Sequence, residues 1–215
     1  MNQKSIADIK ALLFDLDGTL LDSFPVHYEV YKIMFERLGI QINKEIFLST
    51  YSPDWYKTYE AMNLPKEKWE LANSYWLEEA EKHSPGLFTN VSKILLSLSK
   101  YFMLGLVTSG SRTRVMNDLE RTGIKHLFKT IVTGDDIKNP KPSPEGLNLA
   151  LNNLKVKADE AIYIGDTTID FEMAKAGRVY FIGVNSEFRS LNTNHKEYSI
   201  HSITDLPGLL GVEHS

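Results

Sequence analysis

Short apolar runs and longer segments with helical periodicity alternate along the chain. The first apolar run, residues 10–14, is followed directly by Asp15. It is too short for a helix and apolar on both faces, which is typical of a buried parallel strand. Gly18 then interrupts the run. This pattern predicts that the chain opens with a central strand whose carboxyl end carries Asp15.

The next segment has a helical texture. Apolar residues recur at helical spacing in three stripes, within residues 26–38, 55–62 and 69–80. Pro85 and Gly86 end the segment. The pattern predicts a small all-helical domain over residues 22–85, inserted after the first strand. Its aromatic residues are expected to form its core: Trp55, Tyr59, Trp69 and Trp76.

From Leu87 onward, strand and helix patterns alternate, which indicates a parallel sheet. The pattern predicts strands over residues 101–107, 130–133, 161–164 and 179–184, and a short edge strand over 198–201. It predicts helices over residues 91–99, 112–122, 144–154 and 169–176, and a terminal helical turn near Leu206, with Ser143 as a helix N-cap and Pro144 at the first helical position. The fold class is therefore α/β, with a Rossmann-like three-layer core formed by residues 1–21 and 86–215.

Composition and charge narrow the function. Hydrophobic residues make up 42% of the 215 residues, and the formal net charge is −4. A mildly acidic chain offers no electrostatic footprint for nucleic acid or an anionic membrane. The absence of cysteine excludes disulfides, thiolate nucleophiles and zinc–thiolate sites. With no secretory h-region and no membrane-length apolar stretch, the expected location is the cytoplasm.

The candidate chemistry lies where predicted strands end, the position at which open α/β sheets bind ligands. Four groups meet this condition: Asp15 with Asp17, Thr108 with Ser109, Lys141, and Asp166 with Asp170. Converging carboxylates beside a single lysine would repel one another unless a cation joined them. Their ligand atoms are hard oxygens, which makes Mg²⁺ the expected metal.

The spacing of these groups suits attack on phosphorus. Asp15 and Asp17 are two residues apart, so strand alternation would place both on one side of the chain. One carboxylate can attack while the other protonates the leaving oxygen. The hydroxyl of Thr108 and the amides of Ser109 and Gly110 can bind phosphate oxygens at a helix N-terminus.

Four ordered motifs carry a family resemblance: DLDGTL from Asp15, VTSG from Val107, KPSP from Lys141 and GDTTID from Gly165. Together they resemble the motifs of the haloacid dehalogenase superfamily, over a core reaching to Gly177. The inserted helical segment is similar to the cap of the phosphoglycolate phosphatase and β-phosphoglucomutase group. A capped, Rossmann-like enzyme is what the resemblance implies.

The resemblance also implies residue roles. Asp15 is the nucleophile and a metal ligand, and Asp17 is the general acid and then base, with its carbonyl oxygen on the metal. Lys141 holds phosphate and nucleophile together, while Thr108 binds the transferring phosphoryl group. Asp166 is a direct metal ligand, and Asp170 supports the metal site.

Three cap residues are weaker substrate candidates. In this group a histidine often follows the first motif, as His27 does here. Tyr51 and Lys57 lie where cap residues often meet substrate, and Lys57 could bind an anionic leaving group. A solvated lysine and a packing histidine are the plainer interpretations. Hinges are expected at residues 21–23 and 84–86.

Other interpretations stay open at this point. Asp15 and Asp17 could merely start a turn, and the other motif residues could be helix caps or a loop lysine. A β-phosphoglucomutase-like mutase is possible, although its fourth motif usually reads Glu-Asp-Ser and lacks an acid at the place of Asp170. The segment 52–57 also lacks the arginine expected there. A receiver-like phosphoacceptor module would have no inserted cap, and an inactive scaffold would lack a motif residue.

The sequence therefore predicts a Mg²⁺-dependent phosphatase that hydrolyses small phosphate monoesters through an aspartyl-phosphate on Asp15. Phosphoglycolate, sugar phosphates, pyrophosphate and nucleoside monophosphates all fit a small capped site. The expected partner is a small phosphorylated metabolite, with no nucleic acid and no membrane. Either a monomer or a homodimer is compatible with the aromatic-rich cap.

Overall fold

A computed structural model describes residues 8–51, 55–80, 82–184 and 199–212. The chain divides into two compact units, which we call the core unit (residues 1–21 and 86–215) and the helical unit (residues 22–85). The predicted segment 52–57 and edge strand 198–201 each fall partly outside the described residues, at 52–54 and at Tyr198.

Within the described residues, the core unit is built on a parallel sheet of six strands in the order β3-β2-β1-β4-β5-β6. The strands are β1 (Ala11–Phe14), β2 (Met103–Val107), β3 (Phe128–Val132), β4 (Ala161–Gly165), β5 (Tyr180–Val184) and β6 (Ser199–Ile200). β1 lies at the centre, where it pairs with β2 on one side and β4 on the other. All four of its residues are fully buried, which explains why it lacks polar alternation.

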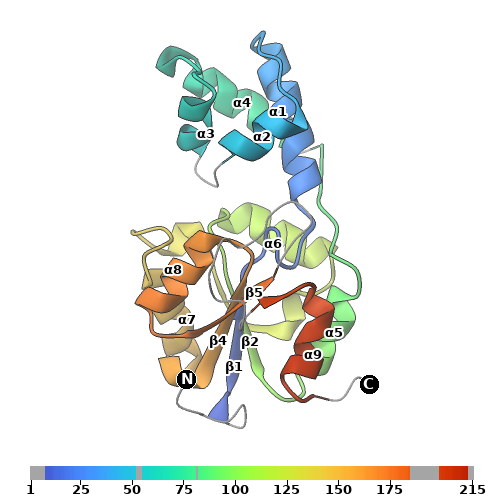
Figure 1. Cartoon of the computed structure of the whole chain (residues 1–215), viewed down its shortest axis with the longest axis vertical. Helices are drawn as coiled ribbons and strands as arrows, with labels where there is room; N and C mark the ends of the chain where they lie inside the picture. The colour runs from blue at the N-terminus through green and yellow to red at the C-terminus, as the bar shows by residue number, and fades with distance from the viewer. Residues whose placement is uncertain (1–7, 52–54, 81, 185–198, 213–215) are drawn as a thin grey trace. The chain divides into compact units, whose positions relative to one another are not determined.

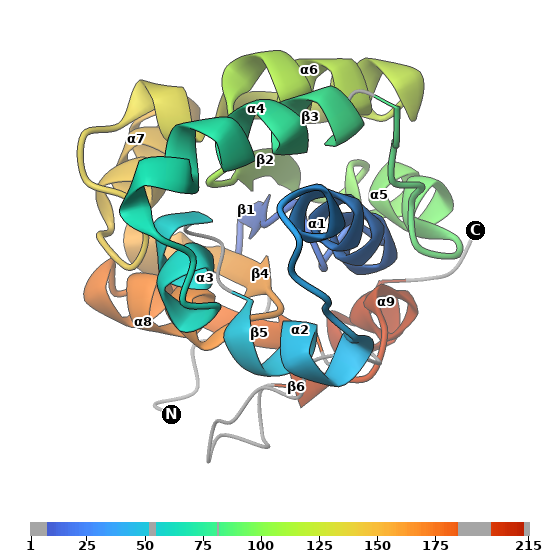
Figure 2. The same cartoon turned by 90° about the horizontal axis from the view of Figure 1, so that it is seen from above.

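Helices cover both faces of this sheet (Figures 1 and 2). They are α5 (Val91–Leu98), α6 (Arg112–Arg121), α7 (Glu145–Leu154), α8 (Thr168–Ala176) and α9 (Leu206–Leu209). Leu12 and Phe14 of β1 pack into a cluster with α5, α6 and α9. Ala11 and Leu13 pack into a second cluster with α7 and α8. The alternation of β1 thus separates two apolar layers, and the three-layer α/β prediction is confirmed.

The helical unit contains α1 (Phe24–Arg37), α2 (Lys44–Thr50), α3 (Trp55–Ala61) and α4 (Trp69–Ala80). Its aromatic core includes the buried Tyr59 and Trp76, as expected. Trp55 and Trp69 are only half-buried; their rings lie 4.5 Å from Trp76 and 6.1 Å from Tyr59. Within the described residues, no helix has the length and apolar character needed to cross a membrane.

Some local features differ from the predictions. Helix α7 begins at Glu145 with Pro144 as its N-cap, one residue later than predicted. The Glu145 amide donates to the hydroxyl of Ser143 at 3.4 Å, so Ser143 accepts a bond from the helix N-terminus as predicted, although the N-cap position is taken by Pro144. The short helix α2 was not predicted, because its seven residues bury only Phe47 and so show no apolar stripe.

Candidate active site

The loop after β1 brings Asp15 and Asp166 together. The amide of Asp15 donates to the carbonyl of Ile164, which extends the pairing of β1 with β4. Gly18 adopts a φ of +80°, and a Cβ at this position would lie 2.8 Å from Cγ of Asp166. Thr19, also in this loop and fully buried, donates to Asp166 Oδ1 at 3.2 Å. The glycine and threonine of the first motif therefore make room for Asp166 and orient it.

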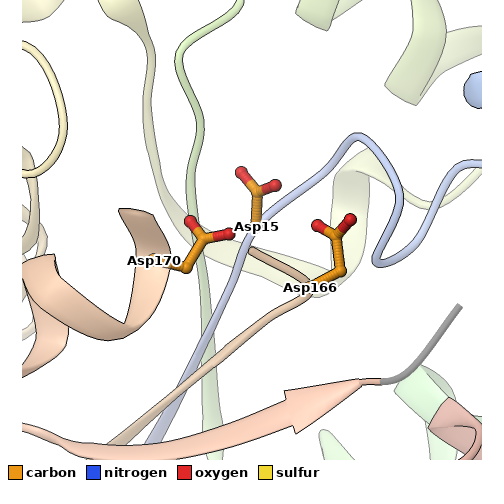
Figure 3. Close-up of side chains that lie close together, drawn as sticks. All are labelled: Asp15, Asp166 and Asp170. Atoms are coloured by element: carbon orange, nitrogen blue, oxygen red, sulfur yellow. The ribbon is translucent and has the colours of Figure 1, made fainter. Parts of the chain in front are cut away.

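Three carboxylates gather at the carboxyl edge of the sheet (Figure 3). Asp15 follows β1, Asp166 follows β4, and Asp170 lies in the first turn of α8. Each offers a carboxylate oxygen, and the three oxygens lie within 4.8 Å of one another. All three residues are buried, with exposed fractions of 7%, 1% and 1% respectively.

Lys141, from the loop between β3 and α7, is the cation of this cluster. Its Nζ donates to Asp15 Oδ1 at 2.7 Å and to Asp170 Oδ1 at 2.8 Å. A third donor contact, at 2.7 Å, goes to the hydroxyl of Tyr163. Lys141 thus binds two of the three carboxylates at once.

Burial and charge set the ionisation of this cluster. Burial raises the pKa of Asp15 to about 7, with the nearby Asp170 carboxylate adding to the rise and Lys141 opposing it. Against the effect of burial, Lys141 and hydrogen bonds from Thr167 and Tyr163 hold the pKa of Asp170 below its usual range. The two carboxylates in turn raise the pKa of Lys141, although burial opposes this. The ammonium group of Lys141 therefore stabilises the ionised carboxylate of Asp170 more effectively than that of Asp15.

The donor set fits a hard divalent cation. Lys141 pairs with two of the three buried carboxylates, so these four groups together carry excess negative charge in a region of low dielectric. Carboxylate oxygens are the ligands that Mg²⁺ prefers. Asp15, Asp166 and Asp170 are the residues that could hold such an ion. The carboxylate of Asp17 is not part of this cluster.

Asp170 also has a structural role. Thr167 and Asp170 form a capping box at the start of α8, in which the Asp170 amide donates to Thr167 Oγ1 at 3.2 Å. The hydroxyl of Thr167 donates to Asp170 Oδ2 at 2.5 Å. The helix-cap role of Asp170 is therefore compatible with the predicted role at the metal site, because its two oxygens have different partners.

The loop after β2 supplies the predicted phosphate-binding groups. Thr108 is buried, and its amide donates to the carbonyl of Val132 at 3.0 Å. The amide of Gly110 donates to Thr108 Oγ1 at 3.3 Å. Ser111 is the N-cap of α6, one residue after Gly110. The loop from Thr108 to Gly110 therefore leads directly into a helix N-terminus, where anions are stabilised.

Sequence reasoning missed two residues of this site. Arg114, in the first turn of α6, pairs with both carboxylate oxygens of Asp17, at 3.0 Å for Nη1 to Oδ1 and at shorter range for Nη2 to Oδ2. Tyr163 of β4 bridges Lys141, the carbonyl of Val107 and Asp170 through its hydroxyl. A hydroxyl inside a wholly buried strand was the available signal for Tyr163, because such a group needs partners.

The three substrate candidates of the helical unit lie on different elements. His27 is on α1, Tyr51 is the C-cap of α2, and Lys57 is exposed on α3. His27 Nδ1 and the hydroxyl of Tyr51 are 3.0 Å apart. The structure therefore joins His27 to Tyr51 within the helical unit, and the substrate roles of all three residues stay predictions.

The fold and this site define an α/β enzyme with an acidic centre at the carboxyl edge of a parallel sheet. The family model of haloacid dehalogenase-like hydrolases matches residues 12–184. The chain belongs to this family of hydrolases.

Relatives and solved structures refine this assignment. Pyrophosphatase PpaX of Bacillus velezensis is 32% identical over 212 residues, covering 95% of this chain and 98% of the relative. Pyrophosphatase PpaX of Bacillus pumilus is 28% identical and covers 99% and 100%. The haloacid dehalogenase-like hydrolase SP0104 of Streptococcus pneumoniae shares the fold with a TM-score of 0.83 at 22% identity, covering 94% of this chain and 99% of that structure. The family match and these relatives together identify the chain as a phosphatase.

Proposed function

We propose that the chain is a Mg²⁺-dependent phosphatase that works through an aspartyl-phosphate on Asp15 and that its substrate is inorganic pyrophosphate or a similarly small phosphate compound. The observation that carries this proposal is the contact of Lys141 with Asp15 inside a buried three-carboxylate cluster. A carboxylate can attack an anionic phosphate only where the repulsion between them is neutralised.

The first half-reaction uses the groups around Asp15. Its carboxylate attacks phosphorus, forming a bond from Oδ while the bond to the leaving oxygen breaks. Lys141 holds the phosphoryl oxygens beside the nucleophile, and Thr108 with the amides of Ser109 and Gly110 binds them from the loop after β2. Asp17 donates a proton to the leaving oxygen. The bound metal ion would supply charge neutralisation at Asp15, Asp166 and Asp170.

The second half-reaction returns the enzyme to its starting state. Asp17, now ionised, takes a proton from a water molecule as that water attacks phosphorus. The acyl-phosphate bond breaks, and the Asp15 carboxylate and inorganic phosphate are released. This use of one carboxylate as nucleophile and another as acid and base requires their surroundings to differ. Their surroundings differ: Asp15 is buried against Lys141, while Asp17 is paired with Arg114, a contact that favours the ionised form in which Asp17 acts as the base.

The choice of pyrophosphate rests on the relatives. The two PpaX proteins are named pyrophosphatases and match nearly the whole of this chain. Phosphoglycolate and sugar phosphates stay in the set of substrates to test, because Lys141 and the loop after β2 are proposed to bind the phosphoryl group that all of these compounds share.

Phosphate release tests the proposal. Wild-type protein with Mg²⁺ should hydrolyse pyrophosphate faster than phosphoglycolate, hexose phosphates or nucleoside monophosphates. Asp15→Asn should lose several orders of magnitude in kcat, because the nucleophile is gone. The matched control is Asp8→Asn, which changes an exposed aspartate of the core unit and should keep wild-type activity. Full activity in Asp15→Asn, or in the presence of excess EDTA, would contradict the proposal.

A further inference from the structure

Arg114 lies beside Asp17, the residue that we propose as acid and base. Lys141 contacts Asp15, whereas Arg114 pairs with Asp17 through both terminal nitrogens. Among the described residues, each of the two carboxylates of the first motif therefore has a cationic partner, Lys141 for Asp15 and Arg114 for Asp17. A guanidinium pairing in this forked way is fixed in direction as well as position.

The phosphate-binding loop leaves space for this arginine. A Cβ at Gly110 would overlap the guanidinium of Arg114 and would lie 2.9 Å from the side chain of Val115. The guanidinium thus occupies the space that a side chain at position 110 would fill. Glycine at this point allows Arg114 to lie against the loop that is proposed to hold the phosphoryl group.

A second carboxylate holds Arg114 from within its own helix. Asp118, one turn further along α6 and mostly buried, lies 3.4 Å from Arg114 Nη1. Arg121 in turn pairs with Asp118 at 2.8 Å. The guanidinium is therefore positioned by partners on both sides and does not depend on Asp17 alone.

We propose that Arg114 is a specificity residue that binds a negatively charged leaving group, such as the second phosphate of pyrophosphate. This inference rests on the proposed function, in which Asp17 delivers a proton to the leaving oxygen. An oxygen within hydrogen-bond reach of Asp17 is roughly two hydrogen-bond lengths, about 6 Å, from the guanidinium. A charged group attached to that oxygen can therefore bind Arg114 when it is oriented towards α6, and this orientation is part of the proposal.

The charge of a leaving group decides how much Arg114 contributes. A phosphate or carboxylate next to the leaving oxygen gains a charge-assisted hydrogen bond, and a neutral alcohol gains none. Loss of such a bond to a charged group corresponds to roughly 10- to 100-fold in affinity. Arg114 would therefore select among substrates by what they release, while Lys141 and the loop after β2 bind the part that all of them share.

Equilibrium binding separates this role from catalysis. Two ligands that cannot be hydrolysed are titrated into the full chain with Mg²⁺ by calorimetry: methylenediphosphonate, with a charged second group, and phenylphosphonate, with an uncharged one. Arg114→Gln should weaken methylenediphosphonate by roughly 10- to 100-fold and phenylphosphonate by less than about threefold. Arg112→Gln is the matched control, because this arginine of the same helical turn pairs with Asp136, at 2.6 Å.

Arg114→Lys provides a second variant, which keeps the charge but loses the fork that matches Asp17. It should give an intermediate loss that is again confined to methylenediphosphonate. Equal weakening of both ligands, no weakening of either, or the same loss in Arg112→Gln would overturn the inference. The binding test needs no turnover, so the two proposals can fail separately. A wild-type protein that releases no phosphate from any substrate would refute the proposed function, and the calorimetry would still decide whether Arg114 binds the charged group.

Discussion

Replacing Asp15 by asparagine should stabilise the metal-free protein, and should do so increasingly as the pH rises. The Asp15 carboxylate is 7% exposed and shares Lys141 with Asp170, so its ionised form is under-compensated in the folded state. This environment raises its pKa from 3.8 to about 7. Asparagine keeps the shape of the side chain and removes the charge.

The size of the effect follows from linkage. Between about pH 4 and pH 7, folded Asp15 keeps a proton that the unfolded chain has already lost, so folding stability falls as the pH rises. From about pH 5 to about pH 8, the cost attributable to this pKa shift grows by about 3 kcal/mol. Below about pH 4 the group is protonated in both states and the cost vanishes.

Urea unfolding in EDTA measures this difference. The free energy of unfolding of Asp15→Asn minus that of wild type should rise between about pH 5 and about pH 8, and the same difference for Asp8→Asn should stay constant. A difference that is flat or falls with pH for Asp15→Asn would show that Lys141 fully compensates the ionised carboxylate. The account of the cluster as carrying excess negative charge would then be wrong.

Three further outcomes are expected. Lys141→Gln should lower the free energy of unfolding of the metal-free protein at neutral pH by about 3–5 kcal/mol, because it removes the cation that pairs with the buried carboxylates. Mg²⁺ should recover part of this loss. Urea unfolding with and without the metal measures both effects. Gly18→Ala should weaken Mg²⁺ binding in calorimetry by at least roughly tenfold, because the added methyl displaces Asp166 and the φ of +80° is strained for alanine; unchanged affinity would show that Asp166 is not a ligand. Tyr163→Phe should lower the free energy of unfolding by about 1–3 kcal/mol while keeping the ring, since it leaves the carbonyl of Val107 without its hydroxyl donor; a stability equal to wild type would mean that this hydroxyl is dispensable.

The sequence was informative wherever a residue type was tied to a strand end. Asp15, Asp166 and Lys141 each follow a predicted strand, and the parallel sheet brings them together as the motif order implies. The wholly apolar sequence of β1 also predicted that this strand is buried. Family and fold were therefore readable before any geometry was known.

Site residues that lie within a helix or strand could not be predicted from the sequence. Arg114 lies in a helix whose other charged residues are Arg112, Asp118, Glu120 and Arg121, and nothing in that spacing indicates that one of them reaches Asp17. The contact joins residues 97 positions apart and depends on the empty space at Gly110. Short helices without an apolar stripe, such as α2, could not be predicted for a related reason, because their stability depends on tertiary neighbours.

The central position of β1 has a consequence for how the protein is made. Ala11 pairs with Met103 on one side and with Ala161 on the other, so the middle of the sheet cannot close until most of the chain has left the ribosome. The helical unit, encoded between β1 and β2, can form its local contacts much earlier. Such long-range pairing is slow, and it exposes an apolar strand during synthesis. We therefore expect the newly made chain to depend on chaperones until β4 has been synthesised, and pulse-labelled truncations ending before and after Gly165 would reveal this as a step in protease resistance.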